Sequence, residues 1–177
     1  PSDARCVATD VTSGLAVLAV MGPKARDVLQ SLTPTDLSND AFPFATSREI
    51  ELGYGIVRAS RITYVGELGW ELYVPTEFAA HIYDEITAAG AEHGMASIGM
   101  HAVNSLRIEK AYRHWGHDIS DEESPIESGL GFAVAWDKAG GFIGRDSLLR
   151  QRDAGVNKRM VQFLLKMLLH ILQEFFK

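Results

Sequence analysis

The sequence predicts an α+β fold in which helices pack on a largely antiparallel sheet. Three features predict it. The uninterrupted apolar run at residues 15–20 is typical of a buried strand. Runs rich in β-branched and aromatic residues surround two glycines within Arg61–Pro75, which is typical of a β-hairpin. Apolar residues then recur at helical spacing, at Phe78, Ile82, Ile86 and Ala89. Because strands and helices are interspersed without an internal repeat, an α+β architecture is favoured.

The first strand turns at Met21-Gly22-Pro23 and leads into a predicted helix. Its apolar residues share one face at the i, i+3, i+4, i+7 spacing, and they are Ala25, Val28, Leu29 and Leu32. Pro34 is expected to end this helix. The loop that follows contains Phe42-Pro43-Phe44. Two interpretations of these rings stay open: they fill the core, or they form one wall of a ligand cleft.

The remaining elements follow from strand-like and helix-like composition between turn residues. Ser124-Pro125-Ile126-Glu127 has the pattern of a capping box, with proline at the first helical position. Glycines at 140–141 make a turn. The other predicted elements are strands at residues 48–52, 55–60, 132–136 and 159–164 and helices at 99–112 and 146–155.

We expect one domain over residues 1–164, incomplete on its N-terminal side, and an amphipathic C-terminal helix of uncertain origin over 165–177. The first residue is Pro1 rather than methionine, so a processed chain or a piece of a longer one is expected. The tail places most of its apolar side chains on one helical face, namely Leu165, Leu168, Leu169, Leu172, Phe175 and Phe176. It either closes an open edge of the core or binds a partner or a membrane surface.

Charge and composition exclude several classes of partner. The 177 residues carry a net charge of −6, from 17 basic and 23 acidic side chains, and the basic residues are not clustered, so no nucleic-acid partner is expected. No run approaches the roughly 20 apolar residues of a transmembrane helix. The single Cys6 and the lack of a visible signal segment favour the cytoplasm, or the mitochondrial matrix in a eukaryote. His114 and His117 lack a third ligand of clear spacing, so no metal is expected.

The hairpin predicted at Arg61–Pro75 suggests a ligand. With a loop of Gly66 to Gly69, Val65 faces Trp70, and the register sets Tyr64 opposite Glu71. An aromatic ring and a carboxylate would then lie with Cβ atoms about 5 Å apart. A flat heterocycle can stack on the ring while its amidine-like edge donates two hydrogen bonds to the carboxylate, as pterins and purines can. The alternative is an ordinary amphipathic hairpin with a solvated glutamate.

Five motifs in order resemble the folate-binding domain of the aminomethyltransferase family. That family includes the glycine-cleavage T-protein and the C-terminal halves of sarcosine and dimethylglycine dehydrogenases, and the dehydrogenase branch fits best. The resemblance runs from about residue 11 to about residue 164. The motifs are the hairpin, D-L-S-N-D-A-F-P-F (Asp36–Phe44), S-L-R-I-E-K-A-Y-R-H-W-G (Ser105–Gly116), S-P-I-E-S-G-L (Ser124–Leu130) and F-I-G-R (Phe142–Arg145).

The resemblance implies one-carbon transfer to tetrahydrofolate. In the family, the folate amine attacks an iminium or aminomethyl carbon and gives 5,10-methylenetetrahydrofolate. Tyr64 and Glu71 match the residues that contact the pterin, and Glu67 matches a position of less certain role. Arg107 matches an arginine that supports the site, and we expect it to be buried and structural. In the dehydrogenase branch FAD belongs to a separate flavin domain, and no G-x-G-x-x-G occurs here.

Two departures from the family pattern bear on function. No residue matches the acid–base aspartate, so the catalytic residues are unknown and turnover by this chain alone is in doubt. Val103 stands where the T-protein has the arginine that grips the folate tail, which argues against a true T-protein. An alternative is a non-catalytic regulatory module on the same fold, as in the pyruvate dehydrogenase phosphatase regulatory subunit.

Overall fold

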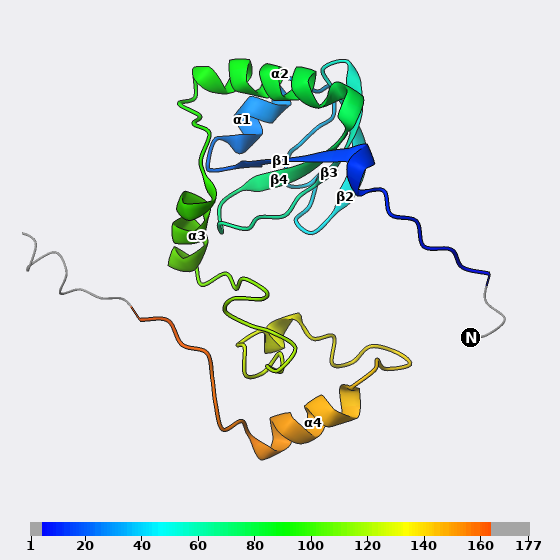
Figure 1. The fold of residues 1–177 in the computed structure, drawn as a ribbon, viewed down its shortest axis with the longest axis vertical. Helices are drawn as coiled ribbons and strands as arrows, with labels where there is room; N and C mark the ends of the chain where they lie inside the picture. Colours follow the sequence, from blue (N-terminus) through cyan, green and yellow to red (C-terminus); the bar gives the residue numbers. More distant parts are fainter. Residues whose placement is uncertain (1–4, 164–177) are drawn as a thin grey trace, which may run out of the picture. The chain divides into compact units, whose positions relative to one another are not determined.

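A computed structural model describes residues 5–163 of the protein (Figure 1). The described chain divides into two units, one up to Tyr112 and one from Arg113 onward. The predicted helix over 165–177 lies outside the described residues. Within residues 5–163, no helix has the length and apolar character that crossing a membrane requires.

The first unit contains a four-stranded antiparallel sheet in the order β1-β4-β3-β2. Its strands are β1 (Leu15–Met21), β2 (Ser47–Leu52), β3 (Gly55–Ser60) and β4 (Gly69–Pro75). Burial alternates along β3 and β4, so that one face of the sheet is apolar and enclosed. The predicted α+β class with a largely antiparallel sheet is therefore confirmed.

Two helices, α1 (Ala25–Gln30) and α2 (Ala79–Ala91), lie on one side of this sheet (Figure 1). Each directs the apolar face that its spacing predicts into the core: Ala25, Val28 and Leu29 from α1, and Ile82 and Ile86 from α2. From the sheet, the core receives Val20, Ile50, Leu52, Val57, Ala59, Trp70, Leu72 and Val74. A third helix, α3 (Met100–Glu109), follows α2.

The opposite face of the sheet stays largely exposed within the described chain. Val17 and Ile56 are 54% and 61% exposed there. Polar side chains share this face because they alternate with core residues: Glu71 and Tyr73 on β4, and Arg58 and Ser60 on β3. We call this surface the open face.

The predicted hairpin register is wrong. β3 ends at Ser60, which lies opposite Glu71, and Arg58 lies opposite Tyr73. The connection between β3 and β4 therefore runs from Arg61 to Leu68 rather than over the two glycines alone. After Ser60 the chain leaves β4 in a tight turn, in which Ile62 N–H donates back to the carbonyl of Ser60 at 2.9 Å. Arg61 stays bonded to the residues before β2: its N–H donates to the carbonyl of Thr46 and its carbonyl accepts from Ala45, both at 2.9 Å.

The second unit contains one α-helix, α4 (Arg145–Ala154), within the described residues, joined by turns and a short 3-10 helix at Gly131–Ala133. The predicted strand at 132–136 is wrong, and residues 159–163 of the other predicted strand are not in a strand either. A strand needs a partner, and here the backbone turns instead, with Trp136 N donating to Val134 O. The capping-box bonds do form, although turns rather than a helix follow.

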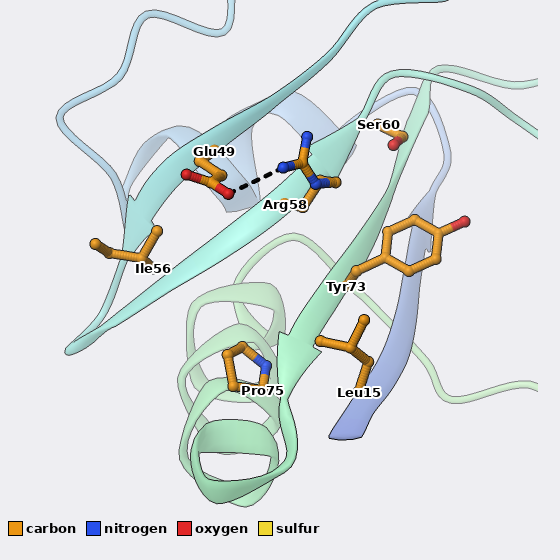
Figure 2. Close-up of a pocket in the computed structure, with 7 residues that line it drawn as sticks. All are labelled: Leu15, Glu49, Ile56, Arg58, Ser60, Tyr73 and Pro75. Carbon is orange, nitrogen blue, oxygen red and sulfur yellow. Dashed lines mark hydrogen bonds and ion pairs between the residues drawn. The ribbon is translucent and has the colours of Figure 1, made fainter. Parts of the chain in front are cut away.

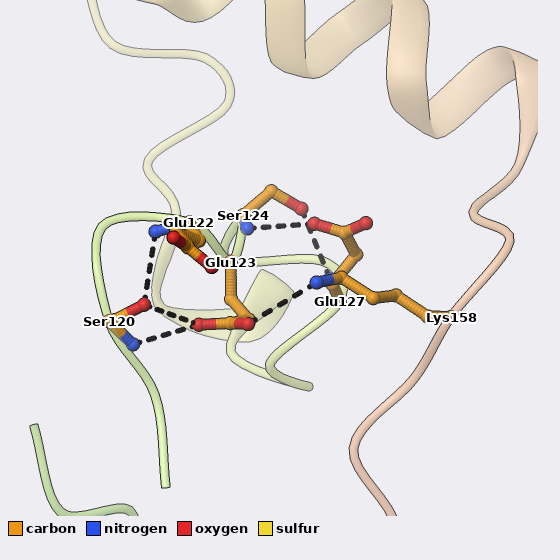
Figure 3. Close-up of polar contacts among 6 residues, drawn as sticks. All are labelled: Ser120, Glu122, Glu123, Ser124, Glu127 and Lys158. Atoms are coloured by element: carbon orange, nitrogen blue, oxygen red, sulfur yellow. Dashed lines mark hydrogen bonds and ion pairs between the residues drawn. The ribbon is translucent and has the colours of Figure 1, made fainter. Parts of the chain in front are cut away.

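Side-chain hydrogen bonds organise the start of this unit (Figure 3). Ser124 N–H donates to Glu127 Oε2 at 2.9 Å, and Glu127 N–H donates back to Ser124 Oγ at 3.2 Å. At Ser120 the N–H and the hydroxyl both donate to Glu123 Oε2 at 2.9 Å. Lys158 Nζ lies 3.2 Å from Glu123 Oε1. These bonds lower the pKa of both carboxyls, chiefly through the serine donors.

Candidate functional site

Glu71 is the third residue of β4 and projects onto the open face. It lies opposite Ala19 of β1 and Ser60 of β3. Its neighbours Trp70 and Leu72 are fully buried on the other face, so the alternation of the strand fixes the direction of Glu71. Glu71 and Tyr73 therefore lie on one face of β4 and Trp70 and Leu72 on the other, as the two-residue period of a strand requires, even though the predicted register is wrong.

The hydroxyl of Tyr73 donates a 2.9 Å hydrogen bond to Glu71 Oε2. This bond raises the pKa of the Tyr73 hydroxyl, and burial and the negative charge of Glu71 raise it further. The tyrosine therefore remains a donor at neutral pH and holds one carboxylate oxygen in place. Residues two apart on a strand share a face, and that spacing is the sequence signal for this pair.

Glu71 keeps unused acceptor capacity. Among the residues that the structure describes, none with a basic side chain lies within ion-pair distance of its carboxylate. A carboxylate offers roughly four lone-pair positions, and the Tyr73 hydroxyl uses one of them. The half-buried Glu71 can therefore still accept hydrogen bonds from a ligand on the open face.

A hollow of about 320 Å³ lies on the open face, and Tyr73 lines it whereas Glu71 does not (Figure 2). Its lining combines apolar side chains with an ion pair in which Arg58 Nη2 lies 2.9 Å from Glu49 Oε1. Figure 2 shows Tyr73 on β4, with Leu15 and Arg58 on the neighbouring strands β1 and β3. The lining residues are Leu15, Glu49, Ile56, Arg58, Ser60, Tyr73 and Pro75.

Tyr64 lies in the connection between β3 and β4, not opposite Glu71. Its N–H donates to Met21 Sδ at 3.4 Å. Met21 lies opposite Gly69, and a Cβ at Gly69 would stand 2.7 Å from Met21 Cγ, so the methionine occupies the space that the glycine leaves. Glu71 lies two residues beyond Gly69 on β4 and on the same face, so their Cα atoms are about 6.8 Å apart. The backbone of Tyr64 thus borders the end of the open face that carries Glu71.

The structure places Glu67 and Arg107 where the connection meets the end of α3. Glu67 Oε1 lies 3.0 Å from Lys110 Nζ. Arg107 is 5% exposed and donates to Asn104 Oδ1 at 3.0 Å and to the carbonyl of Tyr112 at 2.9 Å. Gly66 approaches the same segment with φ +72°, and a Cβ there would stand 2.6 Å from Lys110 Cγ. Neither Glu67 nor Arg107 is brought into hydrogen-bond contact with Glu71.

His114 and His117 stack on each other with ring centroids 4.1 Å apart. Over residues 5–163 there is no group of three or more histidine, cysteine, aspartate or glutamate side chains that could hold a metal ion.

Comparison with known proteins gives one family match and close relatives. The profile of the GCVT N-terminal domain family matches residues 2–138. The chain is 43% identical to mitochondrial sarcosine dehydrogenase of Mus musculus over 157 residues, which are 89% of this chain and 17% of that protein. It is 39% identical to the mitochondrial pyruvate dehydrogenase phosphatase regulatory subunit of Mus musculus over 166 residues, 93% of this chain and 19% of that protein.

Among solved structures, the glycine cleavage system aminomethyltransferase T from Bartonella henselae resembles the chain with a TM-score of 0.64 and 26% identity. The match covers 80% of this chain and 37% of that one. The chain therefore spans less than a fifth of the length of the two curated relatives, and about a third of the structural one.

Proposed function

The chain belongs to the GCVT N-terminal domain family, and on that premise we propose that it is the tetrahydrofolate-binding portion of an enzyme like sarcosine or dimethylglycine dehydrogenase. The observation that carries the proposal is the carboxylate of Glu71. It is half-buried, it faces the open side of the sheet, and it has acceptor capacity that no described basic residue uses. Those properties suit the amidine-like edge of a pterin, which presents adjacent N–H donors.

In this proposal each residue of the site has a defined task. Glu71 accepts two hydrogen bonds from the pterin edge, and an ionised acceptor makes such bonds roughly twice as strong as a neutral one. Tyr73 fixes the rotamer of Glu71 through its 2.9 Å hydrogen bond. Tyr64, at the same end of the open face, supplies the aromatic surface against the ring. Glu67 and Arg107 support the connection that carries Tyr64, through Lys110 and Tyr112.

Tetrahydrofolate would supply the amine that accepts a one-carbon unit from an iminium derived from an N-methyl amine. The contribution of this chain is to position that amine, and positioning can lower a barrier by up to roughly 7–11 kcal/mol. No described residue is assigned a proton-transfer role.

Because relatives at this similarity are several times longer, we propose that a flavin domain with FAD lies elsewhere in the parent protein or complex. The eukaryotic relatives are named as mitochondrial, so the matrix is the proposed location in a eukaryote and the cytoplasm otherwise.

The test is calorimetric titration of tetrahydrofolate, under reductant, into the full-length protein that carries this sequence. Glu71→Gln keeps the shape of the side chain but turns one acceptor into a donor that opposes the pterin N–H. Losing one charge-assisted hydrogen bond costs about 1.5–3 kcal/mol, so binding should weaken by about 10- to 150-fold. Glu51→Gln, a matched change at an exposed position of β2, should bind like wild type. Wild-type affinity in Glu71→Gln would contradict the assignment of the pterin site.

A second function, a non-catalytic regulatory module, is favoured by the 39% identity to the phosphatase regulatory subunit. The same titration separates the two proposals. Folate binding by the wild-type protein that depends on Glu71 supports the enzyme. No folate binding, together with stable capture of a protein partner by the wild-type chain, supports the regulatory module.

A further inference from the structure

Two arginines from distant parts of the chain converge on one amide oxygen in the first unit. Arg26 Nη2 of α1 donates to Asn39 Oδ1 at 2.6 Å, and Arg61 Nη2 donates to the same oxygen at 2.7 Å. Each arginine also binds a backbone carbonyl of the loop between α1 and β2: Arg26 binds Leu37 O at 2.8 Å and Arg61 binds Phe42 O at 2.6 Å. We call Arg26, Asn39 and Arg61 the arginine clamp.

Trp70 lies inside the clamp. The guanidinium carbons of Arg26 and Arg61 are 5.8 and 5.6 Å from the centre of its ring, within the range of cation–π attraction. Phe42 meets the same ring edge-on, with centroids 6.2 Å apart. Trp70 is fully buried. The clamp therefore joins α1, the loop that follows it, and the start of β4 around one indole.

Few hydrogen-bond acceptors are available to the two guanidinium groups of the arginine clamp. Among the described residues, no carboxylate lies within ion-pair distance of either arginine, and Arg61 Nε and Trp70 Nε1 are buried without a hydrogen-bond partner. Burial and the charge of Arg26 together lower the pKa of Arg61. The neutral oxygen of Asn39 is thus the shared acceptor that holds two like charges near each other, and its removal leaves them to repel.

The clamp fixes both ends of the segment that carries the proposed pterin residues. Arg61 is the first residue of the connection that contains Tyr64, and its backbone is also bonded to residues 45 and 46. Trp70 directly precedes Glu71, and on a strand the direction of one side chain sets that of the next. A shift of Arg61 or Trp70 therefore moves Tyr64 or Glu71.

We propose that Asn39 is a positioning residue of the folate site: by bridging Arg26 and Arg61 around Trp70, it holds Tyr64 and Glu71 in the geometry that binds the pterin. The proposal rests on the proposed function of the chain. It also gives a physical task to the asparagine of the motif at Asp36–Phe44, which makes no contact with the open-face hollow.

The test compares tetrahydrofolate titrations of Asn39→Ala, Asn39→Asp and Asn157→Ala in the full-length protein. Asn39 is exposed, so Asn39→Ala should fold and melt within a few degrees of wild type. If misplacement leaves about one molecule in ten competent at any moment, its dissociation constant rises about tenfold at unchanged stoichiometry. Asn39→Asp restores an acceptor for both guanidiniums and should restore the affinity. Asn157→Ala, at an exposed asparagine of the second unit, should match wild type.

The outcomes separate a positioning role from a purely structural one. A structural defect lowers the number of binding sites without changing their affinity, whereas misplacement weakens every site. If wild type binds, Glu71→Gln binds weakly and Asn39→Ala binds like wild type, this inference is overturned and the proposed function stands. If wild type does not bind, the proposed function itself fails. Should Asn39→Ala not fold, Arg26→Lys serves instead, because one ammonium nitrogen does not reproduce the arrangement in which Nε bonds Leu37 O and Nη2 bonds Asn39 Oδ1. Unchanged affinity in that variant overturns the inference.

Discussion

The unit up to Tyr112 and the unit from Arg113 are held together by different interactions. In the first unit, strands and helices enclose a continuous set of fully buried side chains that includes Trp70, Leu72 and Ile82. In the described part of the second unit, Ile119 and Ser128 are the buried residues, at 9% and 2% exposure. Its order comes instead from side-chain hydrogen bonds, among them Arg113 to Ser128 O at 3.0 Å and Trp136 Nε1 to Gly131 O at 3.0 Å.

This contrast predicts unequal stability. Removal of apolar area from water contributes about 25 cal/mol per Å², whereas a hydrogen bond contributes only about 0.5–1.5 kcal/mol net because water competes for both partners. The second unit does contain large apolar residues, but Trp115, Phe132 and Ile143 are 65%, 85% and 104% exposed. Burial of these side chains therefore contributes little to the stability of the described second unit. Its structure depends more on hydrogen bonds, so competition from water and changes in pH and salt should affect it more than they affect the sheet.

The largest expected effect comes from the sheet core. Leu72→Ala removes a fully buried side chain between the sheet and its helices and should lower the free energy of unfolding by about 2–5 kcal/mol. Leu15→Ala makes the same change at a 40% exposed position on the open face, and its cost should stay below about 1 kcal/mol. Denaturant titration followed by tryptophan fluorescence measures both. Equal costs would mean that the two faces of the sheet are equally buried in solution.

A smaller difference between the two units should appear in how readily each one unfolds locally. Regions with few buried contacts open at low free energy, and proteases cut the opened forms. Trypsin should therefore cleave after Lys138 and Lys158 in the second unit at least about tenfold faster than after Arg48 and Arg58 in the sheet. Time-resolved mass spectrometry of the fragments ranks the sites. Cleavage within β2 or β3 before the second unit would reverse the proposed order of stabilities.

Sequence patterns predicted the parts of the fold that local periodicity decides. The apolar run at residues 15–20 became β1, but the burial predicted for it is wrong: β1 is an edge strand with one face exposed, and Val20 is the one buried residue of the run. The helical spacing of Ala25, Val28 and Leu29 became the buried face of α1. The hairpin register failed because contacts made by the fold decide it: Ile62 N–H turns back onto the carbonyl of Ser60, and Arg61 bonds to residues 42, 45 and 46, which are distant in sequence. The strand predicted at 132–136 failed because the described second unit provides no strand to pair with it.

In the candidate site, too, the sequence predicts the features that local periodicity decides and misses those that distant contacts decide. The shared face of Glu71 and Tyr73 follows from the two-residue period of a strand, which sequence alone reveals. Tyr64 was placed opposite Glu71 by a register that the fold does not adopt, and it reaches the same end of the sheet through Met21 instead. The arginine clamp could not be predicted, because its three residues lie far apart in sequence and no spacing rule relates Arg26, Asn39 and Arg61.

The smallest expected effect is the pH dependence of the second unit. Hydrogen bonds from Ser120 and Ser124, with Lys158 near Glu123, lower the pKa of Glu123 and Glu127 in the folded chain. A carboxyl whose folded pKa lies below its unfolded value of about 4.3 contributes stability above that pH and loses it as pH falls through the folded pKa. The amide protons of Ser120 and Ser124, which donate to these carboxylates, should therefore titrate below about pH 4.3 in an NMR series. Glu127→Gln should abolish the titration at Ser124, whereas Glu122→Gln, a neighbouring glutamate whose carboxylate is not the acceptor for Ser124, should preserve it. A midpoint at or above the usual glutamate value would mean that the capping bonds do not hold this unit in solution.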